Sequence, residues 1–385
     1  MDTTICGSTA YQYWRTPPIV KLLAAGSEAD PRLPKIVTEG ELTAFRADLA
    51  ERLPLARACA ASQRNEGRDL WAVREAWPLI APCAEPPVEL LATAPQERHV
   101  SRVAKYALWQ SGLPAGAVRQ ITYDLSATSP AFTLMQLSAR FSVTRMVLLA
   151  SELCGSYAVY RAPRPVAQLL QRIADRGGIP PIGGWSPCLA AGGRLGDLWQ
   201  HEPLATVEDL EDMLVRADFV RGRRTMGEAL KLVKPLAASP FETQAGVLLG
   251  FSRRRGGEGL DGFSFNERVD FTPGARLLAS RSFCRCDLYW PDGLDVECQS
   301  ATFHDNGDSF ISDSDRTAAL RLDGIEVLPL TYAQLGDPER FAAFSKAVAL
   351  ALGRKRVGKS LSQLDAESEL RKEVFVDWWK LPFSN

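Results

Sequence analysis

The feature that most constrains the fold is a pair of strand-like runs near residue 290. The run Phe283–Trp290 (FCRCDLYW) alternates in polarity, as does Leu294–Ser300 (LDVECQS), and the tripeptide PDG lies between them. Two such runs joined by an Asp-Gly turn predict an antiparallel β-hairpin. Because side chains alternate across a strand, we expect Asp287 and Glu297 to converge across this hairpin. Val296 and Cys298 are expected on the opposite, apolar face.

Further elements surround the hairpin in a regular order. Ser239 and Pro240 predict a helix start, since Ser is a favoured N-cap and Pro a favoured first residue. Periodicity then predicts a helix to Leu249, a strand over 266–271, the hairpin, a helix over 313–322, a strand over 325–330 and a helix over 337–352. The order predicts a mixed α/β domain with a central sheet flanked by helices.

The two hairpin carboxylates suggest a metal site. Carboxylates together with substrate phosphate and water are the ligands that Mg²⁺ prefers, and Mn²⁺ is expected to bind in the same way. A cation bound by Asp287 and Glu297 would polarise the phosphate and lower the pKa of a bound water. Two simpler readings stand beside this one: the pair are solvated strand residues, and Glu242 serves the dipole of its helix.

The segment RCDLYWPDGLDVECQSATFH, followed by DSDRTAALRLDGIEVLPLT, resembles one branch of the PD-(D/E)XK nuclease superfamily. That branch is related to very-short-patch-repair endonucleases. Upstream, SPFET resembles the S-P-x-E helix of that family, whose acidic residue corresponds to Glu242. The resemblance extends from about Ser239 to Arg356. The matching positions in and after the hairpin are Asp287, Glu297, His304, Asp313, Arg316, Leu320, Gly324 and the pair Val327-Leu328.

The resemblance implies a metal-dependent endonuclease that acts on DNA, in defence or repair. Glu242, Asp287 and Glu297 would bind Mg²⁺ or Mn²⁺, Gln299 would position water, and His304 would assist proton transfer or hold the phosphate. Members of the family usually have Asp or Lys where this chain has Gln299, and Gln neither takes a proton nor neutralises charge. The alternative is therefore a non-enzymatic regulatory or DNA-binding protein with a degenerate nuclease fold. For His304, the alternative is a structural histidine.

Residues 1–235 are predicted to be mainly helical, with subdomains 1–115 and 116–235, and to bind a partner or DNA. Helical periodicity is clear over 39–53, whereas 101–111 fits a short strand or a helix and 118–125 alternates as a strand does. The Gly- and Pro-rich stretch 177–193 predicts a loop.

Residues 113–157 are similar to the middle region of AbiEi-like bacterial proteins. The similarity lies in an S-P-x-x-T-L core formed by Ser129, Pro130, Thr133 and Leu134. AbiEi proteins are antitoxins and transcriptional regulators of toxin–antitoxin systems, so the similarity implies a protein partner or DNA. Ser129 itself is best explained as a helix cap.

Contacts with DNA must come from local basic patches, because the formal net charge of the chain is -1. We expect Arg253, Arg254 and Arg255 to contact phosphates, since they follow the helix that carries Glu242, and Arg316 to do so from the matched motif. A solvated surface is the alternative for each basic cluster.

The cysteines and the lack of apolar stretches indicate the compartment. Eight cysteines occur without a CxxC pair, and only three histidines accompany them, so a zinc site is not expected. Buried free thiols suit a reducing cytosol. The amino-terminal segment has no signal-peptide pattern, and no run reaches the ~18–20 apolar residues of a membrane span, so we expect a cytoplasmic protein. The tail, residues 357–385, should dock through Trp378 and Trp379.

Overall fold

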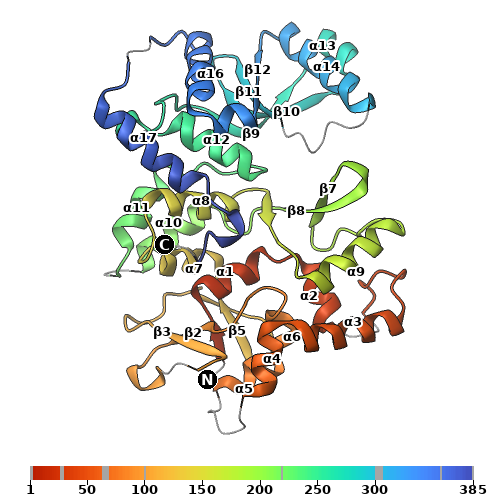
Figure 1. Cartoon of the computed structure of the whole chain (residues 1–385). Helices are drawn as coiled ribbons and strands as arrows, with labels where there is room; N and C mark the ends of the chain where they lie inside the picture. Colours follow the sequence, from red (N-terminus) through yellow and green to blue (C-terminus); the bar gives the residue numbers. More distant parts are fainter. Residues whose placement is uncertain are drawn as a thin grey trace.

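The computed structural model describes residues 3–26, 30–62, 69–98, 101–217, 220–299, 307–355 and 358–383. It is a mixed α/β structure with three sheets of five, four and three strands. Figure 1 shows the five-stranded sheet at one end of the molecule and the four-stranded sheet at the other, with helices between them. The expected α/β class is thus confirmed.

The first sheet has the strand order β3-β2-β1-β5-β4. Its strands are β1 (Thr3–Ile5), β2 (Val88–Ala92), β3 (Ala104–Leu108), β4 (Val118–Gln120) and β5 (Leu125–Thr128). The helices of this part are α1 (Gly7–Arg15), α2 (Pro18–Ala25), α3 (Glu39–Arg52), α4 (Pro54–Ala61), α5 (Asp69–Glu75) and α6 (Trp77–Ile80). Helix α3 matches the expected amphipathic helix and buries the apolar residues Leu42, Phe45 and Leu49.

The middle of the chain holds helices and a small antiparallel sheet of order β6-β8-β7. Its elements are α7 (Pro130–Leu137), α8 (Val143–Leu153), β6 (Tyr157–Val159), α9 (Arg164–Asp175), β7 (Ser186–Ala190), β8 (Arg194–Gln200), α10 (Val207–Arg216) and α11 (Arg223–Leu230). The expected loop over 177–193 therefore contains β7. Ser129 caps α7, its hydroxyl accepting from the Phe132 N–H.

The region before residue 236 is mainly helical, as expected, but strands β1 to β8 also form two sheets there, which the sequence did not predict. Several of these strands have only three residues, which is too few to show the two-residue period that identifies a strand.

The third part follows the expected order, with two extra short helices. It contains α12 (Pro240–Gly250), β9 (Ser264–Asp270), α13 (Pro273–Ala279), β10 (Phe283–Trp290), β11 (Leu294–Gln299), α14 (Gly307–Leu322), β12 (Glu326–Thr331), α15 (Tyr332–Gly336) and α16 (Pro338–Ala351). The sheet order is β12-β11-β10-β9, antiparallel except for the parallel pair β11 and β12. Helices α13 and α15 were not expected.

One apolar core joins the third part to the middle of the chain. A single cluster of buried side chains includes Leu149 of α8, Leu248 of α12, Val296 of β11 and Leu381 of the tail. The core is therefore continuous across residue 235, where the sequence suggests a domain boundary.

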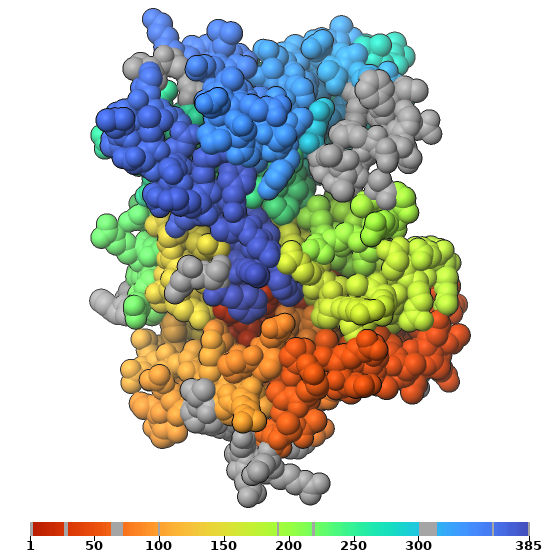
Figure 2. Space-filling view, in the orientation of Figure 1, coloured from red at the N-terminus to blue at the C-terminus, as the bar shows by residue number. Residues whose placement is uncertain are grey.

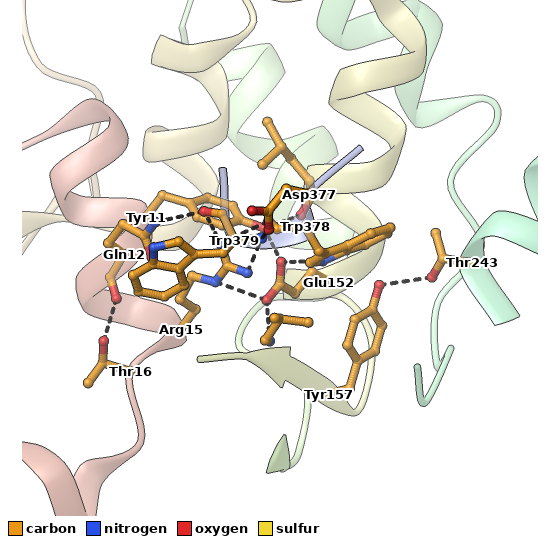
Figure 3. Close-up of polar contacts among 12 residues, drawn as sticks. Tyr11, Gln12, Arg15, Thr16, Glu152, Tyr157, Thr243, Asp377, Trp378 and Trp379 are labelled. Carbon is orange, nitrogen blue, oxygen red and sulfur yellow. Dashed lines mark hydrogen bonds and ion pairs between the residues drawn. The ribbon is translucent and has the colours of Figure 1, made fainter. Parts of the chain in front are cut away.

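The tail runs back to the N-terminal helix. Helix α17 (Leu361–Val374) leads to the short 3-10 turn Trp378–Lys380, and Figures 1 and 2 show this segment lying across the middle of the molecule. In Figure 3, Glu152 accepts a hydrogen bond from the Trp378 indole at 2.9 Å and pairs with Arg15 at 3.1 Å. Trp378 is 6% exposed, which confirms its anchoring role.

Candidate functional site

A cavity of about 950 Å³ lies between the four-stranded sheet and the β7–β8 hairpin. Asp287, Glu297 and Glu242 line it, so the structure brings the three sequence-predicted carboxylates together. Gly196 and Leu198 of β8 line the other wall, and Trp378 of the tail also faces the cavity. The candidate site is therefore enclosed by all of the chain's parts except the N-terminal sheet.

Glu242 lies in the first turn of α12 and is held there by neighbouring donors. Its carboxylate accepts hydrogen bonds from the Ser239 hydroxyl at 2.9 Å, the Ala238 N–H at 2.7 Å and the Asn266 amide at 2.6 Å. Burial raises the pKa of Glu242 to about 7, although these bonds favour the charged form. The residue is thus both a helix-terminal acid, as its position suggests, and part of the site.

Asn266 is a site residue that the sequence did not single out. It belongs to β9 but has a φ of +49°, a backbone conformation that Asn adopts more readily than most residues. Its side chain donates to Glu242 and to the Leu236 carbonyl, so it ties β9 to the start of α12. Nothing in an expected strand reveals such a residue.

Asp287 is positioned where β10 and β11 separate. The two strands pair through Leu288 and Val296, and beyond that pair the Asp287 carboxylate accepts from the Cys298 N–H at 2.8 Å. Burial raises the pKa of Asp287 well above its usual range, and the negative charges of Glu242 and Glu297 raise it further. The side chain therefore lies among other buried acids at the fork between the strands.

Glu297 lies on β11 and is paired with the cation that the matched motif singled out. The Arg316 guanidinium, from α14, donates to its carboxylate at 2.6 Å. Glu297 is 8% exposed, and Arg316 also lines the cavity. Val296 is fully buried, as expected, whereas Cys298 packs against the same core but also lines the cavity beside the carboxylates.

Asp295 is a fourth acid in this region, two residues before Glu297 on the same strand. It is fully buried and lies close to the Cys286 thiol and the Glu297 carboxyl. Burial raises the pKa of Asp295 to about 10, and the neighbouring Glu297 carboxylate contributes to this. The alternation of the hairpin predicts the face of Asp295, but not its complete burial.

The remaining expected site residues lie in three different places relative to the cavity. Gln299 lies at the exposed end of β11 and lines the cavity. His304 lies outside the described residues. The third group, Arg253–Arg255, forms a turn after α12 that packs against α17, and none of its members lines the cavity.

The misplacement of these arginines has a geometric cause. Helix α12 continues for eight residues beyond Glu242, to Gly250, and at 1.5 Å per residue it carries the chain ~12 Å away before Arg253. Arg255 pairs with Glu228 of α11 instead, at 3.2 Å. We therefore correct the expectation that this cluster lies beside the site.

The charge balance of the cavity bears on what it can hold. Of the described residues that line it, four are acidic (Asp197, Glu242, Asp287 and Glu297) and two are basic (Arg316 and Arg321). Excess negative charge in a partly buried cavity favours a cation and disfavours a phosphate alone. Because burial raises the pKa values of Glu242 and Asp287, this excess depends on pH and is fully present only when both carboxyls are ionised.

The arrangement differs from a metal cage built by protein alone. Among the described residues, no group of three or more His, Cys, Asp or Glu side chains is arranged to hold a metal ion. Mg²⁺ usually needs only one or two carboxylates, with water and substrate phosphate as its other ligands. Asp287 and Glu297 supply the oxygen donors that Mg²⁺ or Mn²⁺ prefers and lack the thiolate and imidazole donors of a structural zinc site.

Comparison with protein-family models, with characterised proteins and with solved structures finds no match to this chain. In the described parts of the chain, no helix is both long enough and apolar enough to cross a membrane. All eight cysteines are free thiols, and five of them are buried, as expected.

Proposed function

We propose that this chain is a metal-dependent nuclease that hydrolyses phosphodiester bonds of DNA. The observation that carries the proposal is the meeting of Asp287 and Glu297 at the fork between β10 and β11, in one cavity with Glu242. The order of helices and strands around this fork supports the resemblance to PD-(D/E)XK nucleases, which rests on the sequence.

Each residue of the site has a distinct role in this proposal. Asp287 and Glu297 would hold Mg²⁺ or Mn²⁺, which supplies Lewis acidity toward the phosphate and a water of lowered pKa. Glu242, fixed by three donors, would accept a proton or orient a water, since its pKa of about 7 is close to the optimum for a general base.

Arg316 supplies the positive charge that Gln299 lacks. Members of the family usually have Asp or Lys at the position of Gln299, and here the guanidinium of Arg316 reaches the adjacent Glu297. Arginine keeps its charge at any ordinary pH and stabilises developing negative charge on a phosphate. Gln299 is left to hold water by hydrogen bonds.

Cleavage of plasmid and single-stranded DNA with Mg²⁺ or Mn²⁺ tests the proposal. Wild type should cleave, whereas Asp287→Asn and Glu297→Gln should lose at least a hundred-fold in rate, on the order of what one electrostatic contact to the reacting group contributes. The matched control is Asp292→Asn, an exposed acid in the turn of the same hairpin. Equal rates in all four proteins would place any observed cleavage outside this site.

The second candidate is a non-enzymatic binding or regulatory protein, with DNA or another protein as its partner. Gln299 favours it, together with the use of Glu297 as the partner of Arg316. A titration with Mn²⁺ followed by calorimetry separates the two functions. Binding that Asp287→Asn abolishes supports the nuclease, whereas no binding by folded wild type favours the second candidate.

A further inference from the structure

A second cavity, of about 790 Å³, shares Arg316 with the first. It is formed by residues 280–285, which connect α13 to β10 and begin that strand, together with Arg316. Among the residues that the structure describes, the charged residues that line it are Arg281, Arg285 and Arg316, and no acidic residue does so. We call this cavity the basic groove.

The two cavities have opposite charge and share one side chain. Arg316 lines both, and its guanidinium bonds to Glu297 in the first and lies 3.4 Å from the Arg285 carbonyl oxygen beside the second. A polyanion that contacts a cation bound by the carboxylates would therefore also contact the positively charged arginines of the basic groove, which lie next to that cation. This contrast matches a substrate with several phosphates, only one of which is in the reacting position.

The arginines of the basic groove are available for such contacts. Arg281 and Arg285 are exposed, and among the residues that the structure describes no carboxylate pairs with either of them. The Arg285 guanidinium donates to the Asn266 carbonyl at 2.9 Å, which fixes its direction but leaves other N–H groups to donate. The hydroxyls of Ser280 and Ser282 add two neutral donors of the kind that contact phosphates.

One aromatic ring completes the groove. Phe283 is 37% exposed, and the Arg268 guanidinium lies 4.0 Å from its centroid. A base or sugar can contact such a ring while the phosphates on either side contact arginines. Arginines that alternate with an aromatic residue along the segment that leads into β10 fit a sugar-phosphate backbone better than a small free anion.

We propose that the basic groove binds the nucleic-acid backbone on one side of the bond to be cleaved, through Arg281, Arg285 and Arg316. This inference takes the identity of the neighbouring site from the proposed function, whereas binding in the groove requires no catalysis. It also replaces Arg253–Arg255 as the place where DNA is held near the site.

Binding of fluorescein-labelled oligothymidylate and of a short DNA duplex, measured by anisotropy in EDTA, tests the groove without cleavage. Each lost phosphate contact should lower the slope of log affinity against log salt by about 0.7 for a single strand or 0.9 for a duplex. At 0.1 M salt a slope change of 0.7 corresponds to about five-fold in affinity, so Arg281→Ala should bind about five-fold more weakly. Arg281→Ala combined with Arg285→Ala should bind about 25-fold more weakly, while Arg281→Lys retains most of the affinity.

The matched control is Arg254→Ala, an exposed arginine in the turn after α12. It removes the same charge and should leave both affinity and salt slope unchanged. The inference is overturned if Arg254→Ala and Arg281→Ala weaken binding of both probes equally, or if neither weakens it.

A further comparison separates this inference from the proposed function. Asp287→Asn should bind DNA in EDTA at least as tightly as wild type, because it removes no positive charge. DNA binding through Arg281 by a protein that never cleaves would support the groove and refute the nuclease. Cleavage lost in Asp287→Asn but unaffected in Arg281→Ala, with unchanged binding, would do the reverse.

Discussion

The buried ion pair between Arg15 and Glu152 gives the sharpest prediction about stability. Both side chains are excluded from water, with exposed fractions of 0% and 1%. Glu152 accepts hydrogen bonds from the Val159 N–H, the Tyr11 hydroxyl and the Trp378 indole, in addition to its pairing with Arg15. Every group that faces this carboxylate is therefore a donor.

Glu152→Gln removes the charge and turns one acceptor into a donor. The new amide nitrogen must face two of the existing donors, and Arg15 is left buried without its counter-charge. Loss of one member of a buried pair costs ~3–5 kcal/mol, and we expect the free energy of unfolding to fall by about that amount. In Figure 3 the lost contacts lie where α1, α8 and the tail meet, so the tail should loosen first.

Urea unfolding followed by tryptophan fluorescence and by circular dichroism measures this change. The expected loss corresponds to a fall in the urea midpoint on the order of 1 M, since slopes are ~1–3 kcal/mol per M for small proteins and larger for longer chains. Glu51→Gln, an exposed acid at the end of α3, is the matched control and should change the free energy of unfolding by less than ~0.5 kcal/mol. A loss below ~1 kcal/mol in Glu152→Gln would refute the reasoning, because the pair would then contribute no more than a surface contact.

Three other perturbations follow from the described contacts. In EDTA, Asp287→Asn should gain stability over wild type as pH rises from 5.5 to 8, measured by urea midpoints at both pH values. Because the folded-state pKa of Asp287 is raised, the stability that its protonated carboxyl contributes to wild type is present at low pH and is lost as pH rises. Equal differences between the two proteins at the two pH values would contradict this. Adding Mn²⁺ at pH 8 should raise the melting temperature of wild type but not of Glu297→Gln, as thermal unfolding can show, whereas equal shifts would indicate binding elsewhere. Gly7→Ala should destabilise the protein by ~1–3 kcal/mol, because φ is +52° at the start of α1 and an added Cβ would lie 1.9 Å from a Glu89 oxygen. Unchanged urea unfolding would mean that the backbone at the start of α1 adjusts to the added Cβ without cost.

The third part of the fold was predictable because its signals are local. Strand β10 has eight residues, enough for alternation to be visible, and the PDG turn fixes its partner. Strand β1, by contrast, has three residues and pairs with β2 and β5, so that Ile5 lies opposite Leu90 and Thr3 opposite Leu125. Pairings between such distant short segments leave no periodic trace in the sequence.

The candidate site was predictable to the same extent. Asp287 and Glu297 are placed by the hairpin alone, and Glu242 by the matched helix start. The basic groove was not anticipated, because Arg281 and Arg285 come close to Arg316 only through the packing of α14 against α13. The enclosure of the site by β8 and the tail depends on long-range folding as well, and no motif near residue 290 contains that information.

The position of Trp378 has a consequence for biosynthesis. Val376 and Trp378 form part of the wall of the cavity that the carboxylates also line, yet even Glu297, the last of these carboxylates in the chain, precedes them by about eighty residues. Proteins begin to fold from the N-terminal side as they emerge from the ribosome. A nascent chain that has not yet extended past Trp378 therefore carries the acidic residues without the complete cavity, and the site becomes whole only late in translation, when the tail reaches Arg15 and Glu152.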